Sequence, residues 1–385
     1  ENFKRTTFFH IVHNGNWQYF DSYSRYENGK DLFSLFNIAQ ERYIEFSDPV
    51  KSDKINCMAT GVRFADCVIT VSPSYAKQIK VASDGLERVL TNVVGINNAI
   101  GRDFSERMLN KFKESKFADE YYPKLLDYIK KHRLLHEKIE EKYPEILLGA
   151  DCYKTLKTKI RRDTILRMRN KLMLQLQRGF KVDPDKILFT MIHRVSEQKG
   201  FKLLLEASEG IFKNLGFQGI VGGPVAWGDK QGEELAAGLA RLPDYYRDKV
   251  SVTIGFQDIS IPLLASDLFL MPSLYEPGGI SQLEALACGC LVTARATGGL
   301  RDTVNPVRVK GYIVTGNGFL FADYDAGSFY DAMKRSMDFF KKANERIIHR
   351  ARINAKKSVY YWDKPARKYL DTMYSHKEII RVIDN

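Results

Sequence analysis

The segment Ser273-Leu-Tyr-Glu-Pro-Gly-Gly-Ile-Ser-Gln-Leu-Glu284 decides the fold of this chain. Before it lies the apolar run Asp267-Leu-Phe-Leu-Met-Pro272, which is typical of a buried strand that ends at the proline. After it the spacing of apolar residues becomes helical, beginning at Ile280. The sequence therefore predicts a strand, a tight turn and a helix.

The turn carries groups suited to holding a ligand. Gly278 and Gly279 leave backbone N–H groups open to an anion, because glycine has no Cβ to keep a ligand away. Glu276 and Glu284 are separated by eight positions, on the order of 12 Å along a helix. That spacing lets one carboxylate hold a sugar and the other a ribose. The alternative is a plain strand–turn–helix in which Glu276 only caps the helix.

A second strand end lies about eighty residues earlier. The run from Lys186 to Ile192 is apolar and β-rich, and Arg194 and Lys199 follow it on the loop before a helical segment. Ligands bind at the carboxyl ends of strands in open α/β sheets. A guanidinium and an ammonium together suit a diphosphate, whereas basic loop residues alone are usually solvated.

Strands and helices alternate regularly from about residue 182 onward. This alternation predicts a doubly wound parallel sheet. The expected strands are 186–192, 217–222, 250–254, 267–271, 290–294 and 319–321, and the expected helices are 201–213, 232–241, 260–265, 280–288 and 299–304. Earlier in the chain we expect strands at 6–12, 65–72 and 93–97.

Six ordered motifs resemble those of the glycogen and starch synthase family, retaining glucosyltransferases with the two-domain GT-B fold. They are Val12-His13-Asn14, Thr70-Val-Ser-Pro-Ser-Tyr-Ala76, Arg194 to Lys199, Glu276 to Leu283, Thr297-Gly-Gly-Leu-Arg-Asp-Thr-Val304 and Trp362-Asp-Lys-Pro-Ala366. The resemblance implies an α/β GT-B fold, with two Rossmann-like doubly wound domains facing a cleft. It covers nearly the whole chain except an insert at about residues 108–165.

The resemblance also implies an activity and a site. The reaction would move glucose from a nucleotide-diphosphate glucose, with ADP-glucose favoured over UDP-glucose, to the non-reducing end of an α-1,4-glucan. The implied catalytic residues are His13, Arg194, Lys199 and Glu276, with His13 beside the glucose C6. The implied donor-binding residues are Asn97, Phe256, Gly278, Gly279, Ile280, Glu284, Thr297 and Gly298, with the Phe256 ring stacked on the nucleobase.

No cofactor and no metal are expected. Asp183-Pro-Asp185 and Asp323-Tyr-Asp325 match the Asp-x-Asp of metal-dependent transferases. We interpret the first as a turn and the second as a helix cap. Arg194 and Lys199 can themselves neutralise a leaving diphosphate.

Two departures from the family pattern stand out. Glu284 occupies a position where bacterial and plant synthases usually carry Tyr, which leaves the nucleotide preference open. The family's Lys-x-Gly-Gly-Leu loop is absent from the sequence, which starts at a strand midway through the family's first domain. We therefore expect an incomplete first domain, weak activity of this form alone, and a missing segment that is either truncated or supplied by another chain.

The expected organisation has four parts. Residues 1–107 form the remainder of an acceptor-side Rossmann-like domain, and residues 108–180 form a basic helical insert or linker. Residues 181–361 form the nucleotide-sugar-binding domain, and residues 362–385 form a helix that crosses back to the first domain.

The insert holds most of the positive charge. The formal net charge is +12, and residues 111–181 contain nineteen Lys or Arg and ten Asp or Glu. Helical spacing of apolar residues there favours two or three amphipathic helices with solvated charges. A surface for a polyanion or a protein partner is the alternative, but no RNA- or DNA-binding signature accompanies the charge, so nucleic acid is not expected.

Five cysteines, Cys57, Cys67, Cys152, Cys288 and Cys290, form no Cys-x-x-Cys pair. Reduced thiols are the simplest interpretation, and they indicate the cytoplasm or a plastid-like reducing compartment. No apolar stretch approaches the ~18–20 residues of a membrane span.

Two rival functions stay open at this point. Another retaining GT-B transferase with a small or lipid acceptor would carry the same motifs. A non-catalytic, glucan-binding or scaffolding subunit is the second rival, although Arg194, Lys199 and Glu276 are all present.

Overall fold

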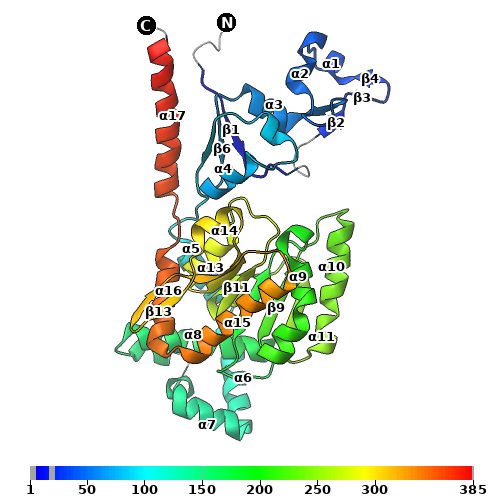
Figure 1. Ribbon diagram of the computed structural model, residues 1–385. Helices are drawn as coiled ribbons and strands as arrows, with labels where there is room; N and C mark the ends of the chain where they lie inside the picture. Colours follow the sequence, from blue (N-terminus) through cyan, green and yellow to red (C-terminus); the bar gives the residue numbers. More distant parts are fainter. Residues whose placement is uncertain (1–5, 17–21, 150, 384–385) are drawn as a thin grey trace.

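The computed structural model describes residues 6–16, 22–149 and 151–383. They form a smaller α/β domain and a larger α/β domain, with a group of helices between them in the sequence (Figure 1).

The first domain is built on a three-stranded parallel sheet with the order β1-β6-β7. Its strands are β1 (Phe9–Val12), β6 (Cys67–Thr70) and β7 (Val93–Gly95), and its main helices are α3 (Cys57–Phe64) and α4 (Pro73–Ile79). The central strand β6 is buried along its whole length, as expected for a parallel strand covered on both faces.

Short elements complete this domain. They are the antiparallel pairs β2 (Ser22–Ser24) with β5 (Lys54–Asn56) and β3 (Tyr26–Glu27) with β4 (Lys30–Asp31), the helices α1 (Leu32–Leu35) and α2 (Tyr43–Phe46), and 3₁₀ turns at Gln40–Arg42 and Leu86–Arg88.

The second domain contains a six-stranded parallel sheet with the order β10-β9-β8-β11-β12-β15. Its strands are β8 (Leu188–Ile192), β9 (Gln218–Gly223), β10 (Val250–Ile254), β11 (Leu268–Met271), β12 (Leu291–Arg295) and β15 (Gly318–Phe321). From β8 the chain adds two strands on one side, β9 and β10, and then three on the other, β11, β12 and β15. This order is that of a doubly wound Rossmann-like sheet, so the prediction is confirmed.

Helices cover both faces of this sheet. They are α9 (Phe201–Glu206), α10 (Lys230–Ala240), α11 (Leu242–Tyr245), α12 (Ser260–Ala265), α13 (Ser281–Ala287), α14 (Gly298–Thr303), α15 (Ala326–Lys342) and α16 (Glu345–Lys357), and a hairpin of β13 (Arg308–Lys310) and β14 (Ile313–Thr315) lies beside them. One expected helix differs. The pattern over 201–213 is divided into α9 and a π-helical turn at Gly210–Leu215.

The insert consists of α5 (Phe104–Glu114), α6 (Phe117–Lys131), α7 (Arg133–Lys142) and α8 (Lys159–Gln177), with 3₁₀ turns at Pro144–Leu147 and Cys152–Thr155. These helices do more than link the domains. Their apolar side chains share one core with Leu188 of β8 and Ile220 of β9. The insert therefore covers part of the second sheet, and α7 projects away from it at the bottom of Figure 1.

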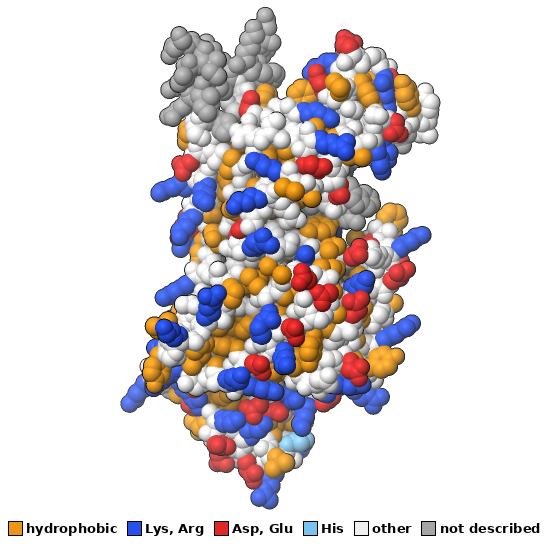
Figure 2. Space-filling view, in the orientation of Figure 1, with side chains coloured by type: hydrophobic (Ala, Val, Ile, Leu, Met, Phe, Trp, Pro, Cys, Tyr) orange, Lys and Arg blue, Asp and Glu red, His pale blue; other side chains and the backbone are white. Residues whose placement is uncertain are grey.

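Several charges on the insert are compensated nearby. Lys124 pairs with Glu120 at 2.7 Å and Lys131 with Asp127 at 2.7 Å, both one helical turn apart. On the face shown in Figure 2, basic side chains are scattered among acidic ones, and the α6–α7 projection carries both signs. The charge excess of this region does not form a continuous basic patch on that face.

The last helix, α17 (Asp363–Ile383), returns to the first domain. Tyr369 packs against Cys67, Ile69 and Ile96 of the first domain. An isolated parallel bridge also joins Ile100 to Tyr361, just before this helix. Within the described residues no helix is long and apolar enough to cross a membrane.

A buried ion cluster fixes α8 to the second sheet. Asp267, at the start of β11, accepts from Lys171 Nζ of α8 at 3.1 Å and from Arg352 Nη2 of α16 at 2.7 Å. The backbone N–H of Leu188 donates to the same carboxylate at 3.1 Å. Burial alone would raise the pKa of Asp267, but the two cations and the N–H outweigh burial and hold that pKa below its ordinary value.

We predict that Asp267→Asn lowers the free energy of unfolding by about 3–5 kcal/mol, because Lys171 and Arg352 would lose their shared carboxylate in a buried place. Since the folded pKa is lowered, the carboxylate's contribution is complete above the ordinary Asp pKa and is lost as the pH falls through the folded value. Urea unfolding at neutral pH and at pH 3 measures both effects.

A matched control is Glu206→Gln, which removes an exposed pair with Lys202 at 3.9 Å. An Asp267 variant as stable as this control would contradict the assignment.

We predict that reversing Lys130 and Lys131 to Glu changes the free energy of unfolding by less than about 1 kcal/mol. Both side chains are exposed, and only the one-turn pair with Asp127 is replaced by repulsion. Thermal unfolding and activity on short acceptors provide the measurement. Pull-downs at low and moderate salt test the alternative, because loss of a bound protein in the reversed variant would show that these helices dock an acidic partner.

Candidate active site

The strand order of the second sheet creates the site. β8 and β11 are neighbours in the sheet, yet the chain leaves β8 toward β9 on one side and leaves β11 toward β12 on the other. The loops that follow these two strands therefore diverge at their carboxyl ends and leave room for a ligand at this reversal. Lys199 follows β8 and Glu276 follows β11, so both belong to this place.

Lys199 and Glu276 form an ion pair. Lys199 Nζ donates to Glu276 Oε2 at 2.7 Å, and the Ser273 hydroxyl donates to the same oxygen at 3.1 Å. The side chains of Lys199 and Glu276 are only 17% and 8% exposed. Lys199 and Glu276, which were expected to bind the diphosphate and the sugar, thus bind each other. Ser273 lies within the deciding segment, but its hydroxyl was not assigned a role from the sequence.

Two glycines permit the loops to approach this closely. At Gly200, after Lys199, φ is +76° and an added Cβ would lie 2.0 Å from the Pro272 carbonyl oxygen. At Gly298, φ is +44° and an added Cβ would lie 2.1 Å from the Glu276 carbonyl oxygen. Both positions need glycine for its left-handed backbone and for its missing side chain.

The two predicted cations differ in setting. Arg194 is exposed, and its Nη2 donates to Gln198 Oε1 at 3.3 Å, so it stands at the surface of the loop that carries Lys199. The neighbouring His193 is buried, and its Nε2 donates to the Leu270 carbonyl at 2.8 Å. Burial, and next the charge of Lys199, lower the pKa of His193 to about 3. His193 is therefore a neutral structural residue that ties the end of β8 to β11.

The first domain contacts the turn directly. Ser72 Oγ donates to the Pro277 carbonyl at 2.7 Å, and Ser74 donates through its backbone N–H and its hydroxyl to Asp302 at 2.9 and 2.5 Å. An added Cβ at Gly278 would lie 2.3 Å from Asn98 Nδ2. The Thr70–Ala76 and Thr297–Val304 motifs thus join the domains beside Glu276, a role that no local pattern in the sequence revealed.

His13 and Asn97 come from the first domain. His13 follows β1 and is exposed, and it makes no hydrogen bond or ion pair within the described residues. Asn97 follows β7, and its Oδ1 is buried without a hydrogen-bond partner in the described part of the chain. Asn97 therefore offers an unused acceptor, whereas His13 makes no contact with the Lys199–Glu276 pair among the described residues.

Glu284 and Phe256 lie apart from the ion pair. Glu284 is half-buried on α13; burial raises the pKa of its carboxyl, and Arg107 of α5 partly opposes this rise. Phe256 follows β10 and is 93% exposed. Trp227, on the adjacent loop after β9, is fully exposed as well and was not assigned from the sequence. Both rings lie on loops at the carboxyl edge of the sheet, where base stacking would take place.

The other predicted donor residues follow the turn. Gly279 has φ +56°, and Ile280, at the start of α13, is 46% exposed. Thr297 is buried at the start of α14, and the N–H of Gly299 donates to the Glu276 carbonyl at 2.9 Å. These contacts fix the backbone position of Glu276.

Three of the four aspartates in the Asp-x-Asp pairs have structural roles. Asp183 accepts from Lys138 at 2.9 Å and Asp185 from Lys142 at 3.0 Å. Asp325 caps α15, accepting from the backbone N–H of Ser328 at 2.8 Å. Among the residues the structure describes, no group of three or more His, Cys, Asp or Glu is arranged to hold a metal ion.

Two family models match the chain. Residues 175–354 match the model described as "Glycosyl transferases group 1". Residues 1–92 match the model described as "Starch synthase catalytic domain". The two matches correspond to the second and first domains of the structure.

Among solved structures, the catalytic domain of starch synthase IV from Arabidopsis thaliana, bound to ADP and acarbose, is similar with a TM-score of 0.67 and 22% identity. That likeness covers 96% of this chain and 67% of that one. A sucrose-phosphate synthase from Thermosynechococcus elongatus is similar with a TM-score of 0.52 and 18% identity, over 97% of this chain and 68% of that one. These likenesses concern the fold, and they confirm the prediction of a GT-B glycosyltransferase fold.

Sequence relatives give the closer relationship. The glycogen synthase of Clostridioides difficile is 30% identical over 381 residues, which are 97% of this chain and 67% of the relative. The glycogen synthase of Thermosipho africanus is 31% identical over 383 residues, 96% of this chain and 66% of the relative. The chain thus spans about two thirds of the length of these relatives. With the motifs assembled around Lys199 and Glu276, these matches show that the chain belongs to the glycogen synthase family of glycosyltransferases.

Proposed function

We propose that the chain transfers glucose from a nucleotide-diphosphate glucose to the non-reducing end of an α-1,4-glucan, with retention of configuration. The Lys199–Glu276 pair at the strand-order reversal carries the proposal, because it places one cation and one carboxylate where a sugar diphosphate needs them. We favour ADP-glucose over UDP-glucose as the donor. The support is that the similar starch synthase IV structure is one bound to ADP.

In this proposal Lys199 gives up its ion pair with Glu276 and binds the donor diphosphate instead. Arg194, exposed on the same loop, takes further diphosphate oxygens. Glu276, still anchored by Ser273, then accepts hydrogen bonds from sugar hydroxyls. The two basic side chains offset the negative charge that develops on the leaving diphosphate, which is where electrostatic stabilisation is most effective.

The remaining residues hold the ends of the donor. The amides of Gly278 and Gly279 add donors near the diphosphate, and Glu284 binds ribose hydroxyls. Phe256 stacks on the base through a ring that is 93% exposed. Asn97 Oδ1, buried and without a partner within the described residues, is available to a substrate hydroxyl. Thr297, Gly298 and Ile280 shape the turn, and His13 lies toward the glucose C6.

The chemical step exchanges one bond for another at the glucose C1. The bond from C1 to the diphosphate oxygen breaks, the acceptor hydroxyl oxygen bonds to C1 from the same face, and its proton passes to the departing phosphate. No second carboxylate is needed as a nucleophile, in contrast to retaining glycosidases. The proposal uses no metal, since Arg194 and Lys199 supply the positive charge.

The proposed setting is a reducing compartment such as the cytoplasm. Cys67, Cys288 and Cys290 are buried free thiols, and burial raises the pKa of Cys288 to about 12, so it is not a reactive thiolate. Whether a further segment of the first domain is truncated or supplied by another chain is tested by the intact mass of the natural protein.

Assays of ADP- and UDP-sugars against glycogen and small acceptors test the proposed function. Transfer from ADP-glucose to glycogen is the expected outcome. Transfer only to a small or lipid acceptor would assign the chain to another GT-B activity, and glucan binding without transfer would assign it a non-catalytic role.

We predict that Lys199→Ala lowers kcat at least about 100-fold, because the leaving diphosphate loses a charge that acts mainly in the transition state. The measurement is steady-state kinetics on the full-length natural protein. Lys202→Ala is the matched control, since Lys202 lies three residues away with an exposed side chain. Similar kcat values for the two variants would show that Lys199 does not act on the diphosphate.

We predict that Glu276→Gln removes most activity while the melting temperature changes little. The Gln amide oxygen can still accept from Lys199 and Ser273, but it lacks the charge that strengthens hydrogen bonds to sugar hydroxyls. Calorimetric unfolding and initial rates are compared in the same preparation. A large loss of stability with normal turnover would instead favour a purely structural carboxylate.

A further inference from the structure

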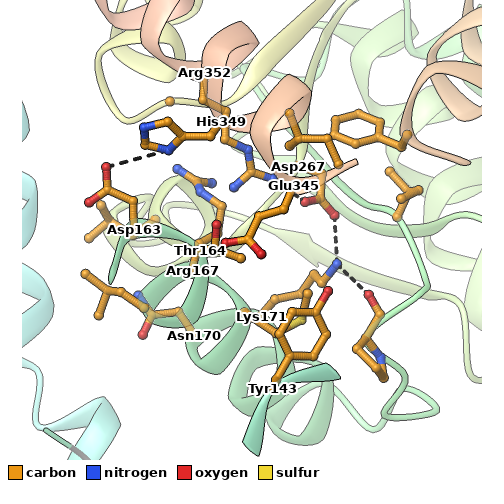
Figure 3. Close-up of a pocket in the computed structure, with 18 of the residues that line it drawn as sticks. Tyr143, Asp163, Thr164, Arg167, Asn170, Lys171, Asp267, Glu345, His349 and Arg352 are labelled. Atoms are coloured by element: carbon orange, nitrogen blue, oxygen red, sulfur yellow. Dashed lines mark hydrogen bonds and ion pairs between the residues drawn. The ribbon is translucent and has the colours of Figure 1, made fainter. Parts of the chain in front are cut away.

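A separate cavity of about 490 Å³ lies at the other end of the second sheet. It is bordered by α8, α16 and the chain just before β8 and β11, the amino ends of the strands whose carboxyl ends carry Lys199 and Glu276. Its volume is within the range of about 300–1,000 Å³ typical of small-molecule sites. Figure 3 shows its polar side chains converging from α8 and α16.

Positive charge exceeds negative charge in the lining, with six Lys or Arg and four Asp or Glu. Three of the four carboxylates already have cationic partners within 3.2 Å. These pairs are Asp185 with Lys142 at 3.0 Å, Asp267 with Lys171 and Arg352 at 3.1 and 2.7 Å, and Glu345 with Arg161 at 3.2 Å. The fourth, Asp163, lies 3.9 Å from His349 Nδ1.

Hydrogen-bond donors are left over. Arg352 Nε is buried and has no acceptor, and the Lys356 ammonium has no hydrogen bond or ion pair, in each case among the described residues. Lys356 Nζ and Arg167 Nη2 lie 3.8 and 3.3 Å from the place that a Cβ on Gly289 would take, so the two cations are neighbours. Figure 3 shows the Arg167 and Arg352 guanidinium groups close together in the cavity.

These cations raise each other's electrostatic energy. Burial and next the charge of Arg167 lower the pKa of Arg352 to about 10, and the same two causes lower the pKa of Lys356. Arg167 donates to the carbonyls of Ser266 and Cys288, at the ends of α12 and α13. Each helix end supplies only about half a negative charge. The group formed by Arg167, Arg352 and Lys356 therefore stays positive.

We propose that this cavity binds a phosphate dianion, either free or as the phosphoryl group of a small monoester. Lys356 and Arg352 Nε supply the unused donors, and the charge of Arg167 adds attraction. A dianion is favoured over a carboxylate because Arg167, Arg352 and Lys356 converge on one place, while Asp267, the partner of Arg352, is shared with Lys171 and the carboxylate that attracts Lys356 is Asp163. The site is independent of the proposed transfer reaction.

Isothermal titration calorimetry of inorganic phosphate and of glycerol 3-phosphate into the full chain tests the proposal. We expect Lys356→Met to weaken binding at least about tenfold, since a desolvated charge contact is lost. Glu345→Gln should tighten binding several-fold, because it removes a negative charge from the lining. Tighter binding of the monoester would indicate a metabolite as the ligand, and equal or weaker binding would indicate the free ion.

Lys199→Ala is the control for the other phosphate-attracting place and should leave this binding unchanged. Equal affinity in wild type and Lys356→Met, or loss of binding in Lys199→Ala alone, would overturn the proposal. Circular dichroism shows whether Lys356→Met folds. If it does not, Glu345→Gln tests the proposal instead, and unchanged or weaker phosphate binding by that variant would overturn the proposal.

Discussion

The reversal of strand order between β8 and β11 is the constraint on which the rest of the structure depends. Adjacent parallel strands that continue in opposite directions must leave their carboxyl-end loops apart. Lys199 and Glu276 stand on those two loops and meet across the gap at 2.7 Å. Gly200 and Gly298 then allow the surrounding backbone to close in without a side chain in the way.

Much of this arrangement could be predicted from the sequence because its signals are local. The apolar runs before Arg194 and before Glu276 are short enough to indicate strands, and the glycines after Glu276 indicate a turn. The second sheet follows from these and from the alternation of strands and helices after about residue 182, and the resemblance to the family follows from the six ordered motifs. The direct pairing of Lys199 with Glu276 does not, since it depends on two segments 77 residues apart that meet only when the sheet has formed.

The insert shows where counting charges fails. Arg169 and Lys171 contribute to its positive total, yet both are buried on α8. Lys171 forms an ion pair with Asp267, 96 residues later, and the residue spacing of α8 does not predict that partner. The same holds for Ser72, which lies in a recognisable motif but acts by donating to the Pro277 carbonyl in the other domain. Long-range polar partners are specified by the fold and not by the local pattern.

The ion pair between Lys199 and Glu276 also has a consequence for selectivity. The pair is internally neutral, so a simple anion must compete with a carboxylate that Lys199 and Ser273 already contact. In the proposed reaction a sugar nucleotide compensates both partners at once, giving phosphate oxygens to Lys199 and hydroxyls to Glu276. An ion that satisfies only the lysine leaves a buried carboxylate unpaired, which is energetically unfavourable. In the proposed reaction this ion pair thus discriminates against fragments of the donor.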